Sequence, residues 1–324
     1  MPRVSIIIPN YNHAAFLTQR IDSVLAQTFR DFEIIILDDY STDQSRKIIE
    51  SYRGDPRVSI EFNSINSGCV FKQWNKGIQC AGGDYLWIAE SDDYSSPEFL
   101  EKLVGVMERN PNVGVAFCDS FRVCGDEISP ARERWFGEFA RLYENDFTAN
   151  GQEYVSSQML FFNTIPNASS ALFRRELALQ LGGADESFLL SGDWLFWISM
   201  LGLSDIAYVA TPLNYYRYHE QTARHANLTN GVMLEDALRI STFVLENFQV
   251  TADRAELVKE RLTSWFIETM MKQRKHIPVS RQKRIRQLAS QLNPDSKRRY
   301  WLRRSGIGYV MLGIQRRMKE WSSH

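Results

Sequence analysis

Apolar and polar positions along the first 120 residues alternate between two periods. Five short apolar or alternating runs are typical of β-strands, and they lie at residues 4–8, 32–37, 58–62, 85–89 and 113–117. Four stretches between them have apolar residues at helical spacing, and they cover about residues 15–27, 42–52, 71–80 and 97–110. Strands that alternate with helices predict an α/β fold with a mainly parallel, Rossmann-like sheet flanked by helices.

The pattern changes beyond residue 120. Residues 126–150 are polar and aromatic without a clear period, so we expect a mobile loop over a binding site. Two further strands are expected at residues 206–210 and 213–218, and the chain is predicted to be helical from residue 227 onward. We therefore predict two domains, an α/β domain of residues 1–225 and a basic helical C-terminal region of residues 226–324.

Composition is that of an ordinary soluble globular protein, with 44% hydrophobic and 24% charged residues. The four cysteines form no Cys-x-x-Cys pair, which predicts reduced thiols in a cytosolic protein. The first apolar run begins at Val4 and leaves no room for a signal peptide, and no stretch is apolar enough for a membrane span. We expect a cytoplasmic protein, with peripheral attachment to the inner face of a membrane as an option.

Charge is distributed unevenly along the chain. Residues 272–320 contain fifteen Lys or Arg and only two acids, Asp295 and Glu320, so this segment carries +13 within a chain of net charge −1. Basic helices that also carry interfacial aromatics such as Trp301 can lie on an anionic membrane. A solvated appendage or a homodimerisation arm is the alternative, and nucleic acid is disfavoured because no reader motif accompanies the charge.

Two acidic clusters follow two of the predicted strands. Asp38, Asp39 and Asp43 come directly after the run at residues 32–37, and residues 90–93 (Glu-Ser-Asp-Asp) follow the run at residues 85–89. Carboxylates packed this closely repel one another unless a divalent cation or a polar ligand offsets the repulsion. The carboxyl ends of strands in open α/β sheets are where such sheets bind ligands. The clusters therefore favour an enzyme that handles a nucleotide-linked substrate through a metal ion.

Residues 3–220 resemble the family 2 glycosyltransferases of GT-A fold. The resemblance depends on ordered motifs, which are Val4-Ser5-Ile6-Ile7-Ile8-Pro9-Asn10-Tyr11-Asn12, Ser23-Val24-Leu25-Ala26-Gln27-Thr28, Asp38-Asp39-Tyr40-Ser41-Thr42-Asp43, Asn66-Ser67-Gly68, Asn75-Lys76-Gly77, Glu90-Ser91-Asp92-Asp93 and Gly192-Asp193-Trp194. It implies an inverting, metal-dependent hexosyltransferase that uses a nucleoside diphosphate sugar, with UDP preferred and dTDP next. The acceptor implied is a glycan or lipid-linked oligosaccharide of a surface polysaccharide such as O-antigen or capsule.

The resemblance also implies where the nucleotide binds. Asp39 matches the aspartate that accepts a hydrogen bond from the base, which suits the N–H of uracil. Further nucleotide contacts are expected from Pro9, Tyr11 and Asn12 after the first strand and from Ser91, with Tyr11 stacking on the base. Lys72 falls near the diphosphate, although a solvated helix lysine is an equal alternative.

The segment Glu90-Ser91-Asp92-Asp93 matches the family's Asp-x-Asp-Asp pattern, which holds Mn²⁺ or Mg²⁺ against the diphosphate. We expect Asp92 to be the chief protein ligand, with Asp93 supporting it or orienting the sugar. Glu90 stands where an aspartate is usual and is expected to act through water or on a sugar hydroxyl. His219 matches a histidine near the metal or diphosphate, with a structural histidine as the alternative.

Asp193 is the catalytic residue that the resemblance implies. The family has an acidic pair before an aromatic helix, and its second acid removes the proton from the acceptor hydroxyl. This chain keeps that second acid and has Gly192 in place of the first. Trp194 and Trp197 form either an acceptor platform or a core stripe of the helix.

Two other functions stay open. A catalytically silent nucleotide-sugar-binding subunit is compatible with the departures at Glu90 and Gly192. A sugar-phosphate nucleotidyltransferase is disfavoured, because residues 10–15 lack a Gly-rich basic loop.

Overall fold

The protein is described from a computed structural model, which describes residues 1–219 and 229–304. Contacts divide it into two compact units, Met1–Thr222 and Ala223–His324. The boundary predicted near residue 225 lies outside the described residues. Each unit is considered by itself.

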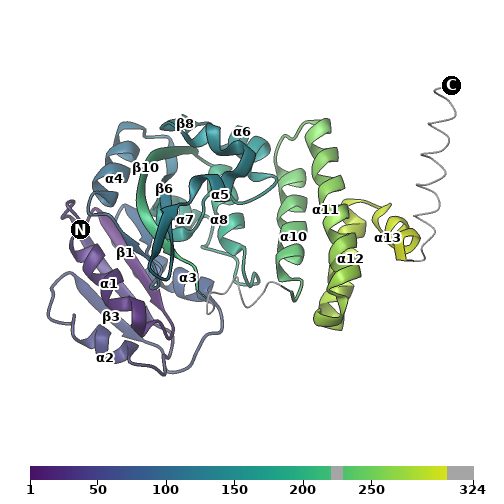
Figure 1. The fold of residues 1–324 in the computed structure, drawn as a ribbon. Coiled ribbons are helices and arrows are strands. Elements are labelled where there is room, and N and C mark those ends of the chain that lie inside the picture. The colour runs from purple at the N-terminus through teal and green to yellow at the C-terminus, as the bar shows by residue number, and fades with distance from the viewer. Residues whose placement is uncertain (220–228, 305–324) are drawn as a thin grey trace. The chain divides into compact units, whose positions relative to one another are not determined.

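A single sheet of ten strands organises the first unit (Figure 1), in the order β3-β2-β1-β4-β9-β6-β10-β5 with β7 and β8 attached at β6 and β10. The strands are β1 (Val4–Asn10), β2 (Phe32–Asp38), β3 (Val58–Phe62), β4 (Tyr85–Ile88), β5 (Tyr94–Ser95), β6 (Val113–Cys124), β7 (Glu127–Pro130), β8 (Phe147–Ala149), β9 (Ala171–Arg174) and β10 (Asp205–Arg217). Strands β1 to β4 pair parallel with one another and β10 pairs parallel with β6, whereas β5, β7, β8 and β9 pair antiparallel. The predicted α/β fold with a sheet flanked by helices is therefore confirmed, and the sheet is mixed.

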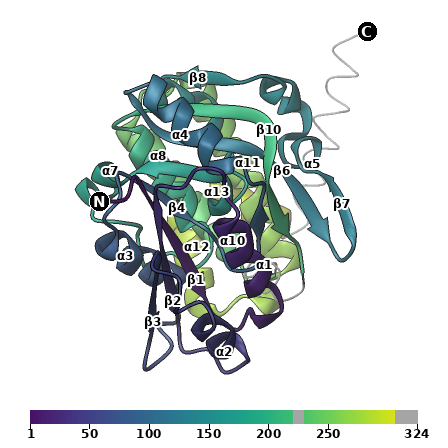
Figure 2. The same cartoon turned by 90° about the vertical axis from the view of Figure 1, so that its left-hand side faces the viewer.

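Helices cover both faces of this sheet. They are α1 (Ala14–Leu25), α2 (Ser45–Glu50), α3 (Val70–Cys80), α4 (Phe99–Arg109), α5 (Arg132–Phe136), α6 (Gly151–Tyr154), α7 (Arg175–Gln180) and α8 (Gly192–Leu201). Strand β1 is buried along its whole length, with Ile6 and Ile8 in one core cluster beside Leu17 of α1. Ile7 points to the opposite face, where Gly77 of α3 leaves no room for a Cβ atom, which would lie 2.4 Å from the Ile7 side chain. Figure 2 shows α1 and α3 on opposite sides of β1.

Two local predictions were wrong. The segment at residues 126–150, predicted as a loop, contains β7, α5, β8 and the 3₁₀ helix Gly137–Tyr143. Aromatic side chains stabilise it, since the rings of Phe136 and Tyr143 stack and Tyr143 meets Tyr208 of β10 edge to face. The two strands predicted around Pro212 are one strand, β10, whose pairing with β6 shifts register at Pro212.

The second unit is helical over residues 232–304. It contains α10 (Val232–Asn247), α11 (Ala252–Lys272), the 3₁₀ turn Arg274–His276, α12 (Val279–Leu292) and α13 (Ser296–Arg304). Phe266, Ile285 and Tyr300 are among its buried residues. Among the residues that the structure describes, every helix is too short or too polar to cross a membrane.

Candidate active site

The acidic clusters lie at one edge of the sheet. Strand β1 pairs with β2 on one side and β4 on the other, all three parallel, so their carboxyl ends meet there. Asp39 follows β2 and residues 90–93 follow β4. Residues 11–13 lie between them, after β1. Because the connections turn in opposite directions on the two sides of β1, this edge is a topological switch point, where open α/β sheets bind ligands.

Asp39 is buried, and its carboxylate accepts hydrogen bonds from four neighbouring groups. Oδ1 accepts from the Asn63 amide at 2.7 Å, the Gln73 amide at 3.0 Å and the Ser67 N–H at 2.9 Å, and Oδ2 accepts from the Ser67 hydroxyl at 2.7 Å. A carboxylate offers about four lone-pair sites, so these donors occupy it. A uracil N–H would therefore have to replace one of them.

The loops around Asp39 are braced by its neighbours. Asp38 accepts from the Asn10 side chain at 2.7 Å and from the Ser41 N–H at 3.0 Å, so it fixes the loop. Asn12 has a positive φ of 57°, and its side-chain oxygen accepts from the Thr42 N–H at 2.7 Å. Both residues therefore shape the edge of the sheet.

Two aromatic rings project from these loops. Pro9 is buried within β1, whereas the Tyr11 side chain is 47% exposed and Tyr40, after β2, is 51% exposed. Tyr11 is therefore not a core ring and is available to stack on a base. Lys72, also exposed, lies in the first turn of α3 and donates to the Ser67 carbonyl at 3.4 Å.

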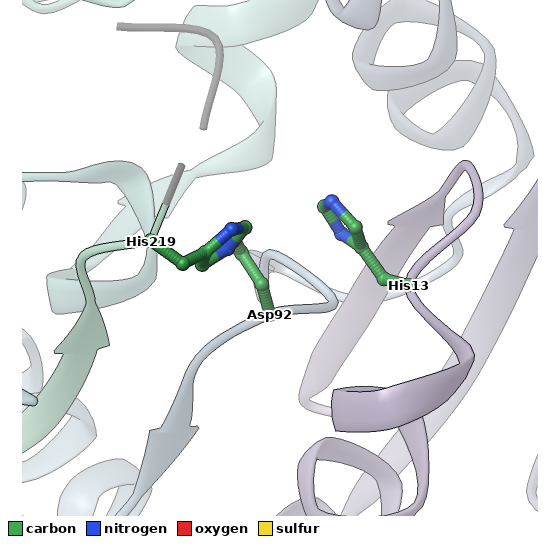
Figure 3. Close-up of side chains that lie close together, drawn as sticks. All are labelled: His13, Asp92 and His219. Carbon is green, nitrogen blue, oxygen red and sulfur yellow. The ribbon is translucent and has the colours of Figure 1, made fainter. Parts of the chain in front are cut away.

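Asp92 lies with two histidines in one cluster (Figure 3). His219 Nε2 is 3.1 Å from Asp92 Oδ2, and His13 contributes a second imidazole, with potential ligand atoms of all three within 4.8 Å of one another. The ring of His219 also packs on Phe16 at a centroid distance of 4.9 Å. The cluster draws together the loop after β1, the loop after β4 and the segment after β10.

The protonation states of this cluster suit a cation. Burial lowers the pKa of His13, which favours the neutral imidazole that binds metals. Burial opposes ionisation of Asp92, but the hydrogen bond with His219 and the electrostatic influence of the two histidines outweigh it, and the pKa of Asp92 lies below its usual value. An ionised carboxylate between two imidazoles is a recognised donor set for divalent metals.

The spacing of the cluster is also compatible with a metal. Ligand atoms at about 2.0–2.2 Å from a shared ion lie at most about 4.4 Å apart. The ligand atoms of the cluster lie within 4.8 Å of one another, so the three side chains would have to move closer together to share an ion. His13, Asp92 and His219 therefore fit a divalent cation.

Asp93 faces the protein interior instead. It is 3% exposed, and its carboxylate accepts from the Arg217 N–H at 2.9 Å and from the Asn167 amide. The fully buried guanidinium of Arg20 lies 4.0 Å from it. Burial and Asp92 raise the pKa of Asp93 to about 7. Asp93 therefore holds the acidic loop onto the core and is not exposed to a sugar.

Arg20 and Arg217 fix the same loop through its backbone. Arg20 Nε donates to the Glu90 carbonyl at 2.8 Å, and its Nη2 donates to the Ser169 hydroxyl at 3.1 Å. Arg217 donates to the Asp92 carbonyl and packs over the Phe16 ring. These two cations position the acidic loop.

Glu90 and Ser91 have their own partners. The Trp74 indole donates to Glu90 Oε1 at 2.9 Å, and burial raises the pKa of Glu90 to about 8, with the Asp92 charge adding to the effect. The Ser91 hydroxyl lies 2.8 Å from His13 Nδ1 and orients that ring. In the described part of the chain, the carboxylate of the histidine cluster is Asp92, and a metal-binding role for Glu90 remains a prediction.

Asp193 lies in the first turn of α8, where a helix favours a negatively charged side chain. The helix begins at Gly192 with Ser191 as its N-cap residue, so Asp193 is not a plain cap. The Asn163 amide donates to Asp193 Oδ2 at 2.9 Å. Asn167, four residues later, donates to Asp93. Four residues span at most about 14 Å, so this segment ties Asp193 to the acidic loop.

The helix explains why the chain has one acid rather than two. A Cβ atom at Gly192 would lie 2.6 Å from the ring of Phe71, so no larger residue fits there without repacking. Trp194 and Trp197 are buried, and Trp197 contacts the rings of Phe173 and Trp74. They form the core stripe rather than an acceptor platform.

Several residues of this site were not predicted from sequence. His13, Arg20, Tyr40, Asn163 and Asn167 each contact or adjoin the acidic clusters. A signal was available for His13 and Tyr40, which directly follow motif residues at the ends of β1 and β2. The others reach the site only through tertiary packing.

A Rossmann-like sheet with an acidic loop at its switch point defines the class of GT-A glycosyltransferases. The family model for glycosyl transferase family 2 matches residues 5–178, more than half of the chain, and the chain belongs to that family. An uncharacterised glycosyltransferase of Haemophilus influenzae is 26% identical over 254 residues, which cover 78% of this chain and 79% of that protein. The chain is therefore a family 2 glycosyltransferase.

Solved structures give the same fold. Residues 1–349 of Staphylococcus aureus TarS, in complex with UDP-GlcNAc, match with a TM-score of 0.69 at 19% identity, covering 90% of this chain and 80% of that chain. The mannosyltransferase PcManGT of Pyrobaculum calidifontis, in complex with GDP-Man and Mn²⁺, matches with a TM-score of 0.58 at 15% identity, covering 96% and 81% of the two chains. At these identities the likeness shows the GT-A fold.

Proposed function

We propose that this protein is an inverting, metal-dependent transferase that moves a hexose from a nucleoside diphosphate sugar to a hydroxyl of a glycan or lipid-linked oligosaccharide. The observation that carries the proposal is the joining of Asp193 to the loop of Asp92 by residues 163–167. The general base and the loop that binds the diphosphate would then act on the same bound donor sugar. TarS, similar in fold, binds UDP and UDP-GlcNAc, which supports UDP as the donor nucleotide, with dTDP next.

The base of the donor nucleotide would lie at the end of β2. Tyr11 would stack on one face of uracil, and Pro9 would line the pocket from β1. Asp39 would accept the uracil N–H after displacing one of its present donors, such as the Asn63 amide. Lys72 would approach the diphosphate, where an ammonium group offsets phosphate charge.

Asp92, His219 and His13 would hold the divalent cation, with Glu90 acting through water. When bound, Mn²⁺ or Mg²⁺ would offset the negative charge of the diphosphate. The two imidazoles favour Mn²⁺ over Mg²⁺, which prefers oxygen ligands. Asp93, Arg20 and Arg217 would keep Asp92 in place without touching substrate.

Asp193 would act as the general base. As the acceptor oxygen forms its bond to C1 of the sugar, the bond from C1 to the diphosphate oxygen breaks, and the hydroxyl proton passes to the Asp193 carboxylate. Attack from the face opposite the diphosphate inverts the configuration at C1. The hydrogen bond from Asn163 would orient the carboxylate for this transfer.

Turnover of UDP-sugars with Mn²⁺ and a mixture of glycan acceptors tests the proposal. Asp193→Asn should lower turnover by about 10³-fold or more while UDP binding, measured by calorimetry, changes less than about twofold. Asp185→Asn, an exposed aspartate eight residues earlier, is the matched control and should retain activity. Equal activity of Asp193→Asn and the control would refute the assignment.

A catalytically silent nucleotide-sugar-binding subunit is the second candidate. The filled lone pairs of Asp39 and the packing that excludes an acid at position 192 favour it. UDP binding without turnover for any donor and acceptor would support this reading.

The acceptor and the cellular location are also part of the proposal. The basic helices α12 and α13 would attach the protein peripherally to an anionic membrane surface, where lipid-linked precursors of O-antigen or capsule are extended. Homodimerisation through these helices is the alternative.

A further inference from the structure

An open pocket of about 440 Å³ lies in the helical unit, between α12 and the start of α13. No acidic residue lines it, and the lining side chains, which all carry a polar or charged end group, are Lys283, Arg286, Gln287, Ser290, Gln291 and Lys297. The first five recur at helical spacing and so share one face of α12. Lys297 comes from the first turn of α13, where the helix end adds partial positive charge.

The cations of this pocket differ from the other basic residues nearby. Arg281 and Arg284 both pair with Glu235, at 2.9 and 2.5 Å. Arg299 likewise pairs with Glu260, at 2.6 Å. Each of these three arginines therefore has an acidic partner within the unit, and Arg281 and Arg284 share one.

Lys283, Arg286 and Lys297 have no such counter-charge within residues 1–219 and 229–304. The structure gives Arg286 one weak hydrogen bond, from Nη2 to Gln282 at 3.3 Å, and gives no ion pair for the three. Asp295, the acid closest in sequence, is exposed and does not line the pocket. Three like charges that share a pocket repel one another, and an anion would relieve that repulsion.

The neutral residues that line the pocket indicate which kind of anion it would bind. Gln287 and Gln291 offer amide donors and Ser290 offers a hydroxyl, which together with three cations suit the several oxygens of a phosphate group. The volume exceeds that of a single phosphate. We propose that this pocket binds a phosphodiester or diphosphate group, carried by an anionic lipid headgroup or by a soluble phosphate compound. This proposal is independent of the proposed catalytic function, because its residues lie in the other unit.

Two probes test the proposal on the full chain. The first is inorganic pyrophosphate, and its binding is measured by calorimetry. Divalent metal is left out so that phosphate binding at the catalytic edge is suppressed. The second is sedimentation with vesicles of phosphatidylglycerol and phosphatidylcholine, compared with phosphatidylcholine alone. The pocket variant is Lys283→Gln with Arg286→Gln, and the charge-matched control is Arg298→Gln with Arg303→Gln, two exposed arginines outside the pocket.

Binding of either probe should fall about tenfold or more in the pocket variant and less than about threefold in the control. Loss of vesicle binding alone identifies the lipid headgroup as the source, and loss of pyrophosphate binding alone identifies a soluble phosphate. An equal fall in both variants would show that net charge, not the pocket, attracts the anion, and would overturn the proposal. Failure of wild type to bind either probe would do so too.

The pocket variant must remain folded for this comparison. Lys283 is exposed and the half-buried Arg286 makes one weak hydrogen bond, so the melting temperature of the variant should stay within about 2 °C of wild type. If it does not, Lys297→Gln in α13 replaces it and should weaken the same probe about threefold or more. Unchanged binding in a folded Lys297→Gln protein would likewise contradict the proposal.

Discussion

The two acidic pairs of the catalytic unit are alike in sequence but differ in what offsets their charge. Asp38 and Asp39 accept hydrogen bonds from backbone N–H, amide and hydroxyl groups, and neither has an ion pair within the described residues. Asp92 has an imidazole partner, and Asp93 has the buried guanidinium of Arg20. Neutral hydrogen-bond donors therefore offset the charge of the first pair, whereas an imidazole and a guanidinium group offset the charge of the second pair.

This difference indicates the roles of the two pairs. Neutral donors can be exchanged for those of a base, so the first pair suits recognition of a nucleotide. In the second pair, Asp93 carries the contact to the core and leaves Asp92 to face the two histidines. Because Asp93 makes the contacts to the core, its neighbour Asp92 is available to take part in chemistry.

The largest effect is expected from Asp92→Asn. Losing the anionic ligand should reduce turnover with Mn²⁺ by about 10³-fold, because metal-ion charge stabilisation supplies several kcal/mol. UDP binding in the absence of metal should stay within about twofold, since the first pair is untouched. Steady-state kinetics measures turnover and calorimetry measures UDP binding. A wild-type rate in this variant would contradict the metal-binding role assigned to the second acidic pair.

Arg20→Met should act on stability. At pH 9, well above the pKa of about 7 that Asp93 has beside Arg20, it leaves the buried carboxylate without its cation, which costs about 3 kcal/mol in the free energy of unfolding. Urea unfolding measures this loss. Because the penalty comes from the unpaired charge, adding Asp93→Asn should recover part of it, and a double variant as unstable as the sum of the singles would show that the two residues are not coupled.

A smaller effect, on substrate affinity, is expected from Asp39→Asn. The KM for the donor should rise about tenfold, equivalent to about 1.4 kcal/mol, with kcat little changed. Asp38→Asn is the matched control, because its carboxylate braces the loop and should alter stability rather than KM. If both substitutions raise KM alike, Asp39 contributes loop structure and not base recognition.

The sequence predicted what depends on local pattern. Buried strands such as β1 are continuous apolar runs, and the acidic motifs mark their carboxyl ends. What it missed depends on contacts distant in sequence. In the sequence, Arg20 is an ordinary helix residue, and only the folded structure brings it next to Asp93. Likewise, only the folded structure places the Phe71 ring where it leaves room for nothing larger than glycine at position 192. The segment at residues 126–150 lacked a period because its strands and helices are very short and are stabilised by stacked rings.

The most direct test of the account is the position of Mn²⁺ in crystals of the protein grown with UDP, located by anomalous scattering. If the proposed metal and nucleotide sites are right, there will be one strong peak bound by Asp92 and His219, with His13 beside it and the uracil ring between Tyr11 and Asp39. A peak held by other residues, or a nucleotide bound away from this edge of the sheet, would contradict it.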